Sequence, residues 1–428
     1  MSTIDTPLTA KCLATTGTAF CKSIKECSTA WSANPRRHGR DDGRESNLFR
    51  EAQFSSDGTT IVTHNEDQCL RTFILPTDLL EEHEVPSELA AHSTGPSASN
   101  LQSYAICPYF DLRDPTTTLV LSASSDQPVV LRNALDYSTV HAKYQHVNPT
   151  TEAYIRSNTL AFSRDGRYFI AGSKNQISNF DCSRDTSGPS SHHWTGASRQ
   201  ARQQYGKPSM SCKGIVSALS ISGDGVLAAG TTEREVGLYS NEGRGECITA
   251  FGIEQRGMGG LHLVKGTGIT SLKWSPCGRY LCIAERQCDS IQVYDVRNTL
   301  QWVSRLTGRH ADTTQKLGMD VVNAADGYEI WAGGTDGAVR MWTNPGSKDG
   351  EHTPDAEMKL HQDPVSSAIW HPSGAVLATC SGQRFPLADT DDSDDSSSSE
   401  SDEDPHRPCI SRTQQRAMPD YKLNVWVV

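Results

Sequence analysis

The sequence lacks the features that would place this chain in a membrane or mark it for export. Its 428 residues contain no run of about 18 apolar residues, so we expect no membrane-spanning helix. The start, MSTIDTPLTAKCLATTG, has no basic stretch followed by an apolar one, so we expect no signal peptide. The 13 cysteines include no CxxC pair, which predicts reduced, mostly buried thiols and no zinc site.

The sequence also lacks the motifs of the common enzyme classes. It has no GxxxxGK[ST] phosphate loop, no GxSxG, no HExxH and no kinase motif set. No nucleophile stands in a pattern with a general base, and the adjacent His192 and His193 make a poor metal pair. We therefore predict a protein that is not an enzyme and that uses no cofactor and no metal.

What the sequence does contain is a repeated phrase: an apolar alternation, an aromatic residue, a short turn ending in glycine, and a second apolar run. Copies include SNTLAFSRDGRYFIAGSKN and ITSLKWSPCGRYLCIAERQCD, and a weaker copy, SYAICPYFDLRDPTTTLVLSASSD, fills a gap near the start. Short strands at ten-residue steps, in units of roughly 45–55 residues, predict an all-β, seven-bladed β-propeller of four-stranded blades. The turn glycines are Gly58, Gly166, Gly225, Gly278, Gly327 and Gly374.

Acidic residues recur where the second strand of a unit turns into the third. A short acid at such a turn hydrogen-bonds the backbone of the turn itself. Repetition at equivalent turns favours a structural role over a catalytic one. These structural turn residues are Asp67, Asp126, Asp289 and Asp336.

An acidic, serine-rich stretch interrupts the last repeat. Residues 389–404 hold nine acids and no base, and without them 40 bases face 42 acids, so the net charge changes from -11 to -2. The stretch lies between the strand-like AVLATCSG and YKLNVWVV, which predicts a disordered loop over residues 387–415 inside the last blade. Three serines each precede an acid by three residues and are candidates for an acid-preferring kinase: Ser397, Ser399 and Ser401.

The last blade needs a strand from elsewhere in the chain. YKLNVWVV matches the third strand of a unit, so the seven repeats over residues 47–428 leave one strand missing. An open blade edge is prone to aggregation. We therefore expect residues 1–46 to supply the closing strand, from about residues 18–32.

A basic segment with interleaved aromatic residues, residues 183–213, joins the third and fourth repeats. A single-stranded RNA site needs cations for phosphates and rings for bases. A solvated linker of the same composition is the alternative. The RNA-binding candidates in this segment are Arg199, Arg202, Tyr205 and Lys207.

Four stretches resemble the telomerase Cajal body protein family of WD-repeat proteins. They are DQCLRTFILP, YQHVNPTTEA, YDVRNTLQWVSRLTGRHADTTQK, and HPSGAVLATCSGQRFP followed by an acidic run. The resemblance implies a non-catalytic protein, because members of the family bind small Cajal-body RNAs, including telomerase RNA, and deliver them to nuclear bodies. Fungal relatives are linked to splicing. It therefore implies a nuclear scaffold whose partners are small nuclear or telomerase RNA and proteins of a ribonucleoprotein or splicing complex.

The resemblance also implies surface residues and an alternative function. From the YDVR and SGQR elements it carries over Arg297 and Arg384 as RNA-binding candidates, with Lys316 and Arg309 added, although an arginine at such a position also braces neighbouring blades. A fission-yeast relative mimics a G-protein β subunit, which makes a G-protein α subunit the alternative partner and the cytoplasm an alternative location. A true β subunit begins with a coiled coil, and residues 1–46 show no heptads.

Overall fold

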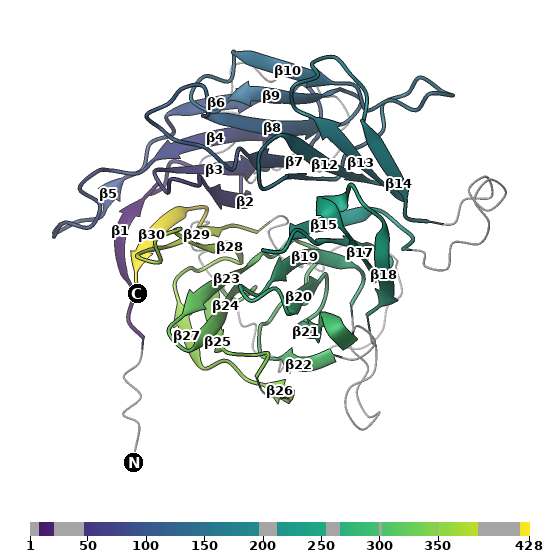
Figure 1. Ribbon diagram of the computed structural model, residues 1–428. Coiled ribbons are helices and arrows are strands. Elements are labelled where there is room, and N and C mark those ends of the chain that lie inside the picture. The colour runs from purple at the N-terminus through teal and green to yellow at the C-terminus, as the bar shows by residue number, and fades with distance from the viewer. Residues whose placement is uncertain are drawn as a thin grey trace, which may run out of the picture.

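The computed structural model describes residues 8–20, 47–196, 212–253, 266–298, 302–347, 349–383 and 420–428. In these residues seven mainly antiparallel sheets form a ring of blades (Figure 1). Six of the seven sheets pair their strands in chain order from the centre of the ring outward, and each blade has four or five strands. The predicted seven-bladed, all-β propeller is therefore confirmed.

Blades 1 to 4 each contain four strands, all from the blade's own repeat. Blade 1 contains β2 (Phe49–Phe54), β3 (Thr60–Asn65), β4 (Cys69–Ile74) and β6 (Ser93–Pro96), and blade 2 contains β7 (Leu101–Ile106), β8 (Leu119–Ser124), β9 (Val129–Asn133) and β10 (Val140–Tyr144). Blade 3 contains β11 (Thr159–Phe162), β12 (Tyr168–Ser173), β13 (Gln176–Asp181) and β14 (Ser191–Trp194), and blade 4 contains β15 (Val216–Ile221), β16 (Leu227–Thr231), β17 (Glu235–Tyr239) and β18 (Cys247–Gly252).

Of the remaining three blades, blades 5 and 7 also take strands from outside their own repeat. Blade 5 contains β19 (Ile269–Trp274), β20 (Tyr280–Glu285), β21 (Ile291–Asp295), β22 (Trp302–Leu306) and β26 (Gly350–His352), and blade 6 contains β23 (Met319–Ala324), β24 (Gly327–Gly333), β25 (Ala338–Thr343) and β27 (Ala356–Lys359). Blade 7 contains β28 (Val365–Trp370), β29 (Leu377–Ser381), β30 (Leu423–Val427), β1 (Lys11–Thr15) and β5 (Ser87–Glu88). Two short 3-10 turns are η1 (Asn241–Gly243) and η2 (Val296–Asn298).

The glycine of the repeated phrase is needed at the turn between the first and second strands. Gly58 has a φ of 74°, in the left-handed region where a side chain is disfavoured. A Cβ at this position would also collide with the ring of His371 in blade 7. The same turn therefore sets the local chain reversal and allows adjacent blades to approach closely.

The hydrophobic core lies between neighbouring blades rather than inside one layer. One buried cluster joins Val236 and Leu238 of blade 4 to Leu281, Ile283 and Tyr294 of blade 5. Strands that are covered on both faces read as nearly continuous apolar runs. This is why the second strand of most repeats is small and apolar throughout, and why blades need their neighbours to be stable.

The ring is closed by β1 from the N-terminal segment. Lys11 lies opposite Val427 and Thr15 opposite Asn424 in an antiparallel pair with β30, while Ala14 pairs with Ser87 of β5 on the other edge. An N-terminal closing strand was expected, but its predicted position, residues 18–32, is wrong. Residues 18–20 form a turn, and residues 21–32 lie outside the described part of the chain.

Two blades gain a fifth strand from the repeat that follows them in the ring. β5 lies in the connection between β4 and β6 of blade 1 and pairs in parallel with β1 of blade 7. β26 lies in the equivalent connection of blade 6 and pairs in parallel with β22 of blade 5. At the closure, β1 is consequently held on both edges.

The acidic stretch connects two neighbouring strands of one blade. β29 and β30 are antiparallel partners, with Leu377 opposite Trp426 and Thr379 opposite Asn424. Residues 384–419 join these strands and lie outside the described part of the chain. The disorder predicted for residues 387–415 therefore stays a prediction.

The prediction of one continuous basic loop over residues 183–213 is wrong in part. β14 lies inside this range and is the fourth strand of blade 3, with Trp194 opposite Gln176 and Ser191 opposite Asn179. This strand could not be recognised from an apolar pattern, because an outer strand is half-exposed and needs little apolar content. Residues 197–211 lie outside the described part of the chain.

Buried histidines make the stability of the fold depend on pH. His146 is 1% exposed and its ring nitrogens lie 2.9 Å and 3.0 Å from the hydroxyls of Ser157 and Ser178. Burial lowers the pKa of His146 to about 4 and, with the nearby Arg50 and Lys316, lowers that of His64 to about 3. Both rings are therefore neutral in the folded protein at pH 5.

We expect the folded protein to lose stability when the pH falls from 7 to 5. The unfolded chain protonates its histidines near pH 6.5, and the folded protein does not protonate these two. Each buried ring therefore lowers the free energy of unfolding by about 2 kcal/mol between pH 7 and pH 5. Urea unfolding at the two pH values measures the change. The variant His146→Gln keeps a hydrogen-bonding side chain that does not titrate, so it should lose less stability over this pH interval than the unchanged protein. An equal loss would show that His146 does not contribute to the pH dependence.

Candidate functional site

The propeller has two faces that differ in the connections they carry. We call one face the turn face, because it holds the connections from first to second strands and from third to fourth strands. On this face Asp57 Oδ2 of blade 1 accepts a hydrogen bond from Leu112 N of blade 2 at 2.8 Å. We call the opposite face the loop face, because it holds the connections from second to third strands and the connections between blades. There Asn175 N of blade 3 donates to the carbonyl of Gly214, ahead of blade 4, at 2.8 Å.

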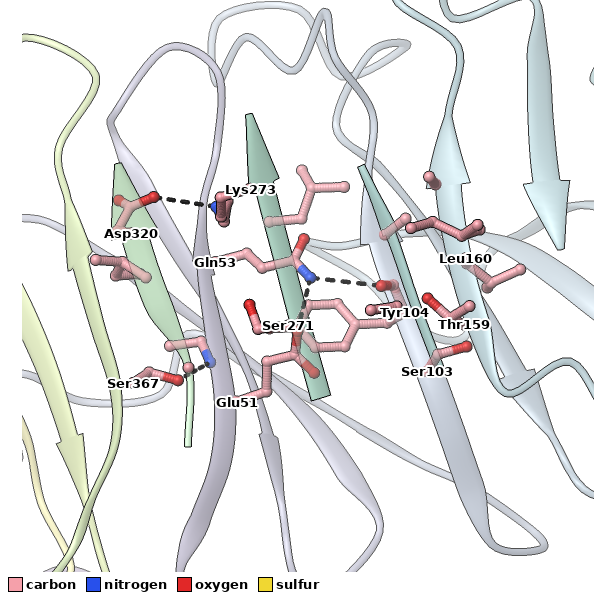
Figure 2. Close-up of a pocket in the computed structure, with 18 of the residues that line it drawn as sticks. Glu51, Gln53, Ser103, Tyr104, Thr159, Leu160, Ser271, Lys273, Asp320 and Ser367 are labelled. Atoms are coloured by element: carbon pink, nitrogen blue, oxygen red, sulfur yellow. Dashed lines mark hydrogen bonds and ion pairs between the residues drawn. The ribbon is translucent and has the colours of Figure 1, made fainter. Parts of the chain in front are cut away.

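A polar channel of about 570 Å³ runs between the innermost strands of the seven blades, as traced by the described residues. Figure 2 shows the side chains of Ser103, Thr159 and Ser271 there, each from a different blade. Lys273 Nζ lies 3.0 Å from Asp320 Oδ1, and this carboxylate raises the pKa of Lys273. The channel therefore offers hydroxyls and an ion pair.

Two more ion pairs stand where the channel opens on the loop face. Lys316, in the connection before β23, lies 3.0 Å from Glu51 Oε2 of blade 1, and its side chain is 42% exposed. Arg50 Nε lies 2.6 Å from Glu66 Oε2. Lys316 thus places an accessible cation at the mouth of the channel, as its selection as an RNA-binding candidate requires.

Arg297 does not share that position. It follows β21, within η2, and therefore lies on the turn face, opposite Lys316. Its Nη2 lies 2.5 Å from Asp295 Oδ2 and its side chain is 65% exposed. The structure therefore separates these two predicted RNA-binding residues onto opposite faces.

Arg309 is a structural residue, and its prediction as an RNA-binding residue is wrong. It is 1% exposed, and its guanidinium donates to the carbonyls of Gly333 at 3.1 Å, Leu317 at 2.9 Å and Gly318 at 2.8 Å. Burial lowers the pKa of Arg309 to about 10, which leaves it charged at neutral pH. A guanidinium that is 1% exposed is out of reach of a phosphate on the surface of the propeller.

The other predicted residues lie outside the described part of the chain: Arg199, Arg202, Tyr205, Lys207, Arg384, Ser397, Ser399 and Ser401. The ends of the segments that carry them are described, and both segments begin and end on the loop face. Cys212 N donates to Thr195 O at 2.5 Å, and Thr195 N donates to Asn175 O at the second-to-third turn of blade 3. Ser381 Oγ donates to the carbonyl of Asp420.

The turn acids differ in what they bind. Asp67 and Asp336 accept hydrogen bonds from backbone N–H groups of their own turns, Cys69 N and Ala338 N, each at 3.2 Å. The same two acids form ion pairs with the arginine four residues later, and Arg340 Nη2 lies 2.6 Å from Asp336 Oδ2. Asp289 instead accepts from the backbone N–H of Ala311. Asp126 occupies its turn with a φ of 58°.

A hydrogen-bonded set in blade 7 was missed by the sequence reasoning. His361 Nε2 lies 2.7 Å from Thr379 Oγ1, which accepts from Trp426 Nε1 at 2.8 Å, and His361 Nδ1 lies 3.2 Å from Asp420 Oδ2. The set ties β29, β30 and the connection between blades 6 and 7 together. The spacing of His361 and Thr379 could have indicated this set from the sequence. Asp420 gave no such indication, because in the sequence it follows the acidic stretch and does not stand beside the second strand of the blade.

Neither a membrane segment nor a metal centre is found in the described residues. Among them, none of the helices has the length and apolar content needed to span a bilayer. They contain no group of three or more His, Cys, Asp or Glu side chains placed to hold a metal ion.

A closed ring of seven blades, with a His–Thr–Trp–Asp set in the last of them, defines a WD-repeat β-propeller. A family model described as WD domain, G-beta repeat, matches residues 353–384. This range contains His361 and Thr379 and ends where the acidic stretch separates them from Trp426.

Comparison with known proteins identifies the family. Guanine nucleotide-binding protein negative regulator 1 of Schizosaccharomyces pombe is 33% identical over 304 residues, which is 70% of this chain and 71% of that protein. Human telomerase Cajal body protein 1 is 25% identical over 344 residues, 79% of this chain and 57% of that protein. The Drosophila melanogaster homolog is 26% identical over 341 residues, 77% of this chain and 56% of that protein.

The chain belongs to the WD-repeat family that contains guanine nucleotide-binding protein negative regulator 1 and telomerase Cajal body protein 1. It is a WD-repeat scaffold whose relatives are named for a Cajal body and for G-protein regulation. It spans somewhat over half the length of the two telomerase Cajal body relatives.

Proposed function

We propose that this protein is a non-catalytic scaffold that binds small nuclear RNA of the Cajal-body or telomerase type, together with proteins of a ribonucleoprotein or splicing complex, in the nucleus. Family membership supports the partner class, through the relatives named for the Cajal body. The observation that carries the proposal is the gathering of the candidate RNA segment and an accessible cation on one face.

The loop face combines these elements as follows. The segment that holds Arg199, Arg202 and Lys207 leaves and re-enters the propeller beside Asn175, and its two ends are hydrogen-bonded to each other. On the same face Lys316 stands at the mouth of the channel. A strand of RNA crossing this face meets cations for its phosphates, and the binding should weaken steeply as salt rises.

Neutralising the loop-face segment should reduce RNA affinity and its salt dependence. For the variant Arg199→Gln, Arg202→Gln, Lys207→Gln we expect the slope of log K against log salt to fall by about 2, since single strands lose about 0.7 per phosphate contact. Fluorescence anisotropy with a terminal-loop hairpin of a small Cajal-body RNA measures both quantities. The control removes equal charge from three exposed arginines of the turn face: Arg113, Arg167 and Arg279.

The proposal fails if the turn-face variant loses as much affinity as the loop-face variant, or if neither binds the hairpin less well than the unchanged protein. Tyr205→Leu tests the stacking of bases separately from the contacts with phosphates. Loss of stacking should lower affinity at all salt concentrations without changing the salt slope. A change in slope alone would indicate that Tyr205 has no stacking role.

Regulation of a G-protein α subunit is the second candidate function, with the cytoplasm as its location. The 33% identity to a guanine nucleotide-binding protein negative regulator favours it. The purified α subunit from the same cell, loaded with GDP or with a GTP analogue, is the direct probe. Binding to either form by the unchanged protein supports this function, and absence of binding to both rejects it.

A further inference from the structure

The two most exposed large apolar side chains of the described residues lie in one short segment. Val85 is 74% exposed and Leu80 is 67% exposed, and both belong to residues 77–88, which we name the arm. The arm leaves blade 1 after β4 and crosses to blade 7, where it ends in β5. In Figure 1 it projects from the edge of the ring beside β1.

The arm is held in place at both ends, so its exposed side chains are presented by an ordered backbone. Leu79 and Leu89 are buried, in the same apolar cluster as Ala14 of β1. Leu89 N donates to the carbonyl of Thr15 at 2.8 Å. Between these anchors, Glu81 N donates to the carbonyl of Asp78 at 2.9 Å, which forms a turn directly beside Leu80.

The charge of the arm is of one sign. It carries five acids and no lysine or arginine, and all five acids are exposed: Asp78, Glu81, Glu82, Glu84 and Glu88. A surface of this charge repels the phosphates of RNA and of anionic lipid. Apolar side chains standing among acids instead match a protein surface that combines apolar residues with lysine or arginine.

We propose that the arm is a docking element for a partner protein that presents a basic segment with apolar side chains. Leu80 and Val85 enter the partner's apolar positions, and the surrounding carboxylates pair with its cations. The arm projects from the outer edge of the ring, so a partner can bind there independently of any ligand on the loop face. This proposal does not depend on the RNA proposal.

A photo-crosslinking residue tests the proposal in the full chain, in its own cells. It replaces Leu80 in one form and Ile248 in another; Ile248 is 50% exposed on β18 of blade 4 and serves as the matched apolar control. We expect a protein adduct from position 80 that position 248 does not give, with an excess of lysine and arginine in the crosslinked segment. Charge reversal at Glu81, Glu82 and Glu84 to lysine should reduce this adduct about tenfold.

A second measurement keeps the test quantitative. The crosslinked segment is synthesised as a peptide, and Leu80→Ser with Val85→Ser should weaken its binding about tenfold. Charge reversal at three exposed acids away from the arm should leave binding unchanged: Asp224, Asp312 and Asp326. The proposal is overturned if positions 80 and 248 give the same adducts or none, or if the adduct is RNA, a second copy of this chain, or a segment without excess positive charge.

Discussion

Placing a carboxylate at Ala14 should destabilise the whole ring. Ala14 is fully buried, with Val425 of β30 on one side and Ser87 of β5 on the other. Ala14→Asp would bury a charge with no partner, which costs about 3–5 kcal/mol. We expect a lower midpoint in urea unfolding, and aggregation by size-exclusion chromatography, since release of β1 exposes the edge of β30.

Ala90→Asp is the control for this experiment. Ala90 is exposed and follows Leu89, close in sequence to β5, so the same substitution there should change the free energy of unfolding by about 0.5 kcal/mol or less. If both variants unfold at the same urea concentration, β1 does not close the ring. If Ala14→Asp alone is destabilised and aggregates, the N-terminal strand is an obligatory part of blade 7.

Removing the carboxylate of Asp420 should be nearly as damaging. Asp420 Oδ2 accepts from Gln362 N at 2.9 Å and lies 3.2 Å from His361 Nδ1, and Lys422 Nζ lies 2.8 Å from Oδ1. Burial raises the pKa of Asp420, but these bonds outweigh burial and hold the pKa well below its usual range. Asp420→Ala leaves buried donors unpaired, at a cost of about 2–3 kcal/mol in unfolding free energy.

The pairing with His361 can be tested separately from the general cost. In a double-mutant cycle, Asp420→Ala and His361→Ala together should cost less than the sum of the two single losses, because the two substitutions remove one hydrogen bond in common. Asp312→Ala, at an exposed position between blades, should have almost no effect. Additive losses from the two substitutions would show that Asp420 and His361 stabilise blade 7 independently.

The number of blades was predictable because it rests on local chemistry. In six of the seven repeats the first strand reverses at a glycine with positive φ, as at Gly58, so the repeat is visible without knowledge of contacts. The closing strand was not predictable in the same way. Lys11–Thr15 is too short to show a pattern, and it is a strand only because β30 and β5 offer it partners on both edges.

The candidate site was predicted less well, for reasons that differ between residues. The separation of Arg297 from Lys316 follows from counting strands: one stands after a third strand and the other before a first strand, which places them on opposite faces. A bracing role was the stated alternative for Arg309, but its three carbonyl partners could not be predicted, because they belong to a connection and a strand that only the folded ring brings together. The role of Asp420 was hidden by the acidic stretch before it.

The most direct test of the proposed function is crosslinking of this protein to RNA in its own cells, followed by sequencing of the bound RNA. The proposal predicts enrichment of small nuclear or telomerase RNAs, with crosslinks concentrated at terminal loops. It also predicts that enrichment is lost in the Arg199→Gln, Arg202→Gln, Lys207→Gln variant and kept in the variant of the turn-face arginines. RNA recovery no greater than in an uncrosslinked control would contradict the proposal and leave regulation of a G-protein α subunit as the function to pursue.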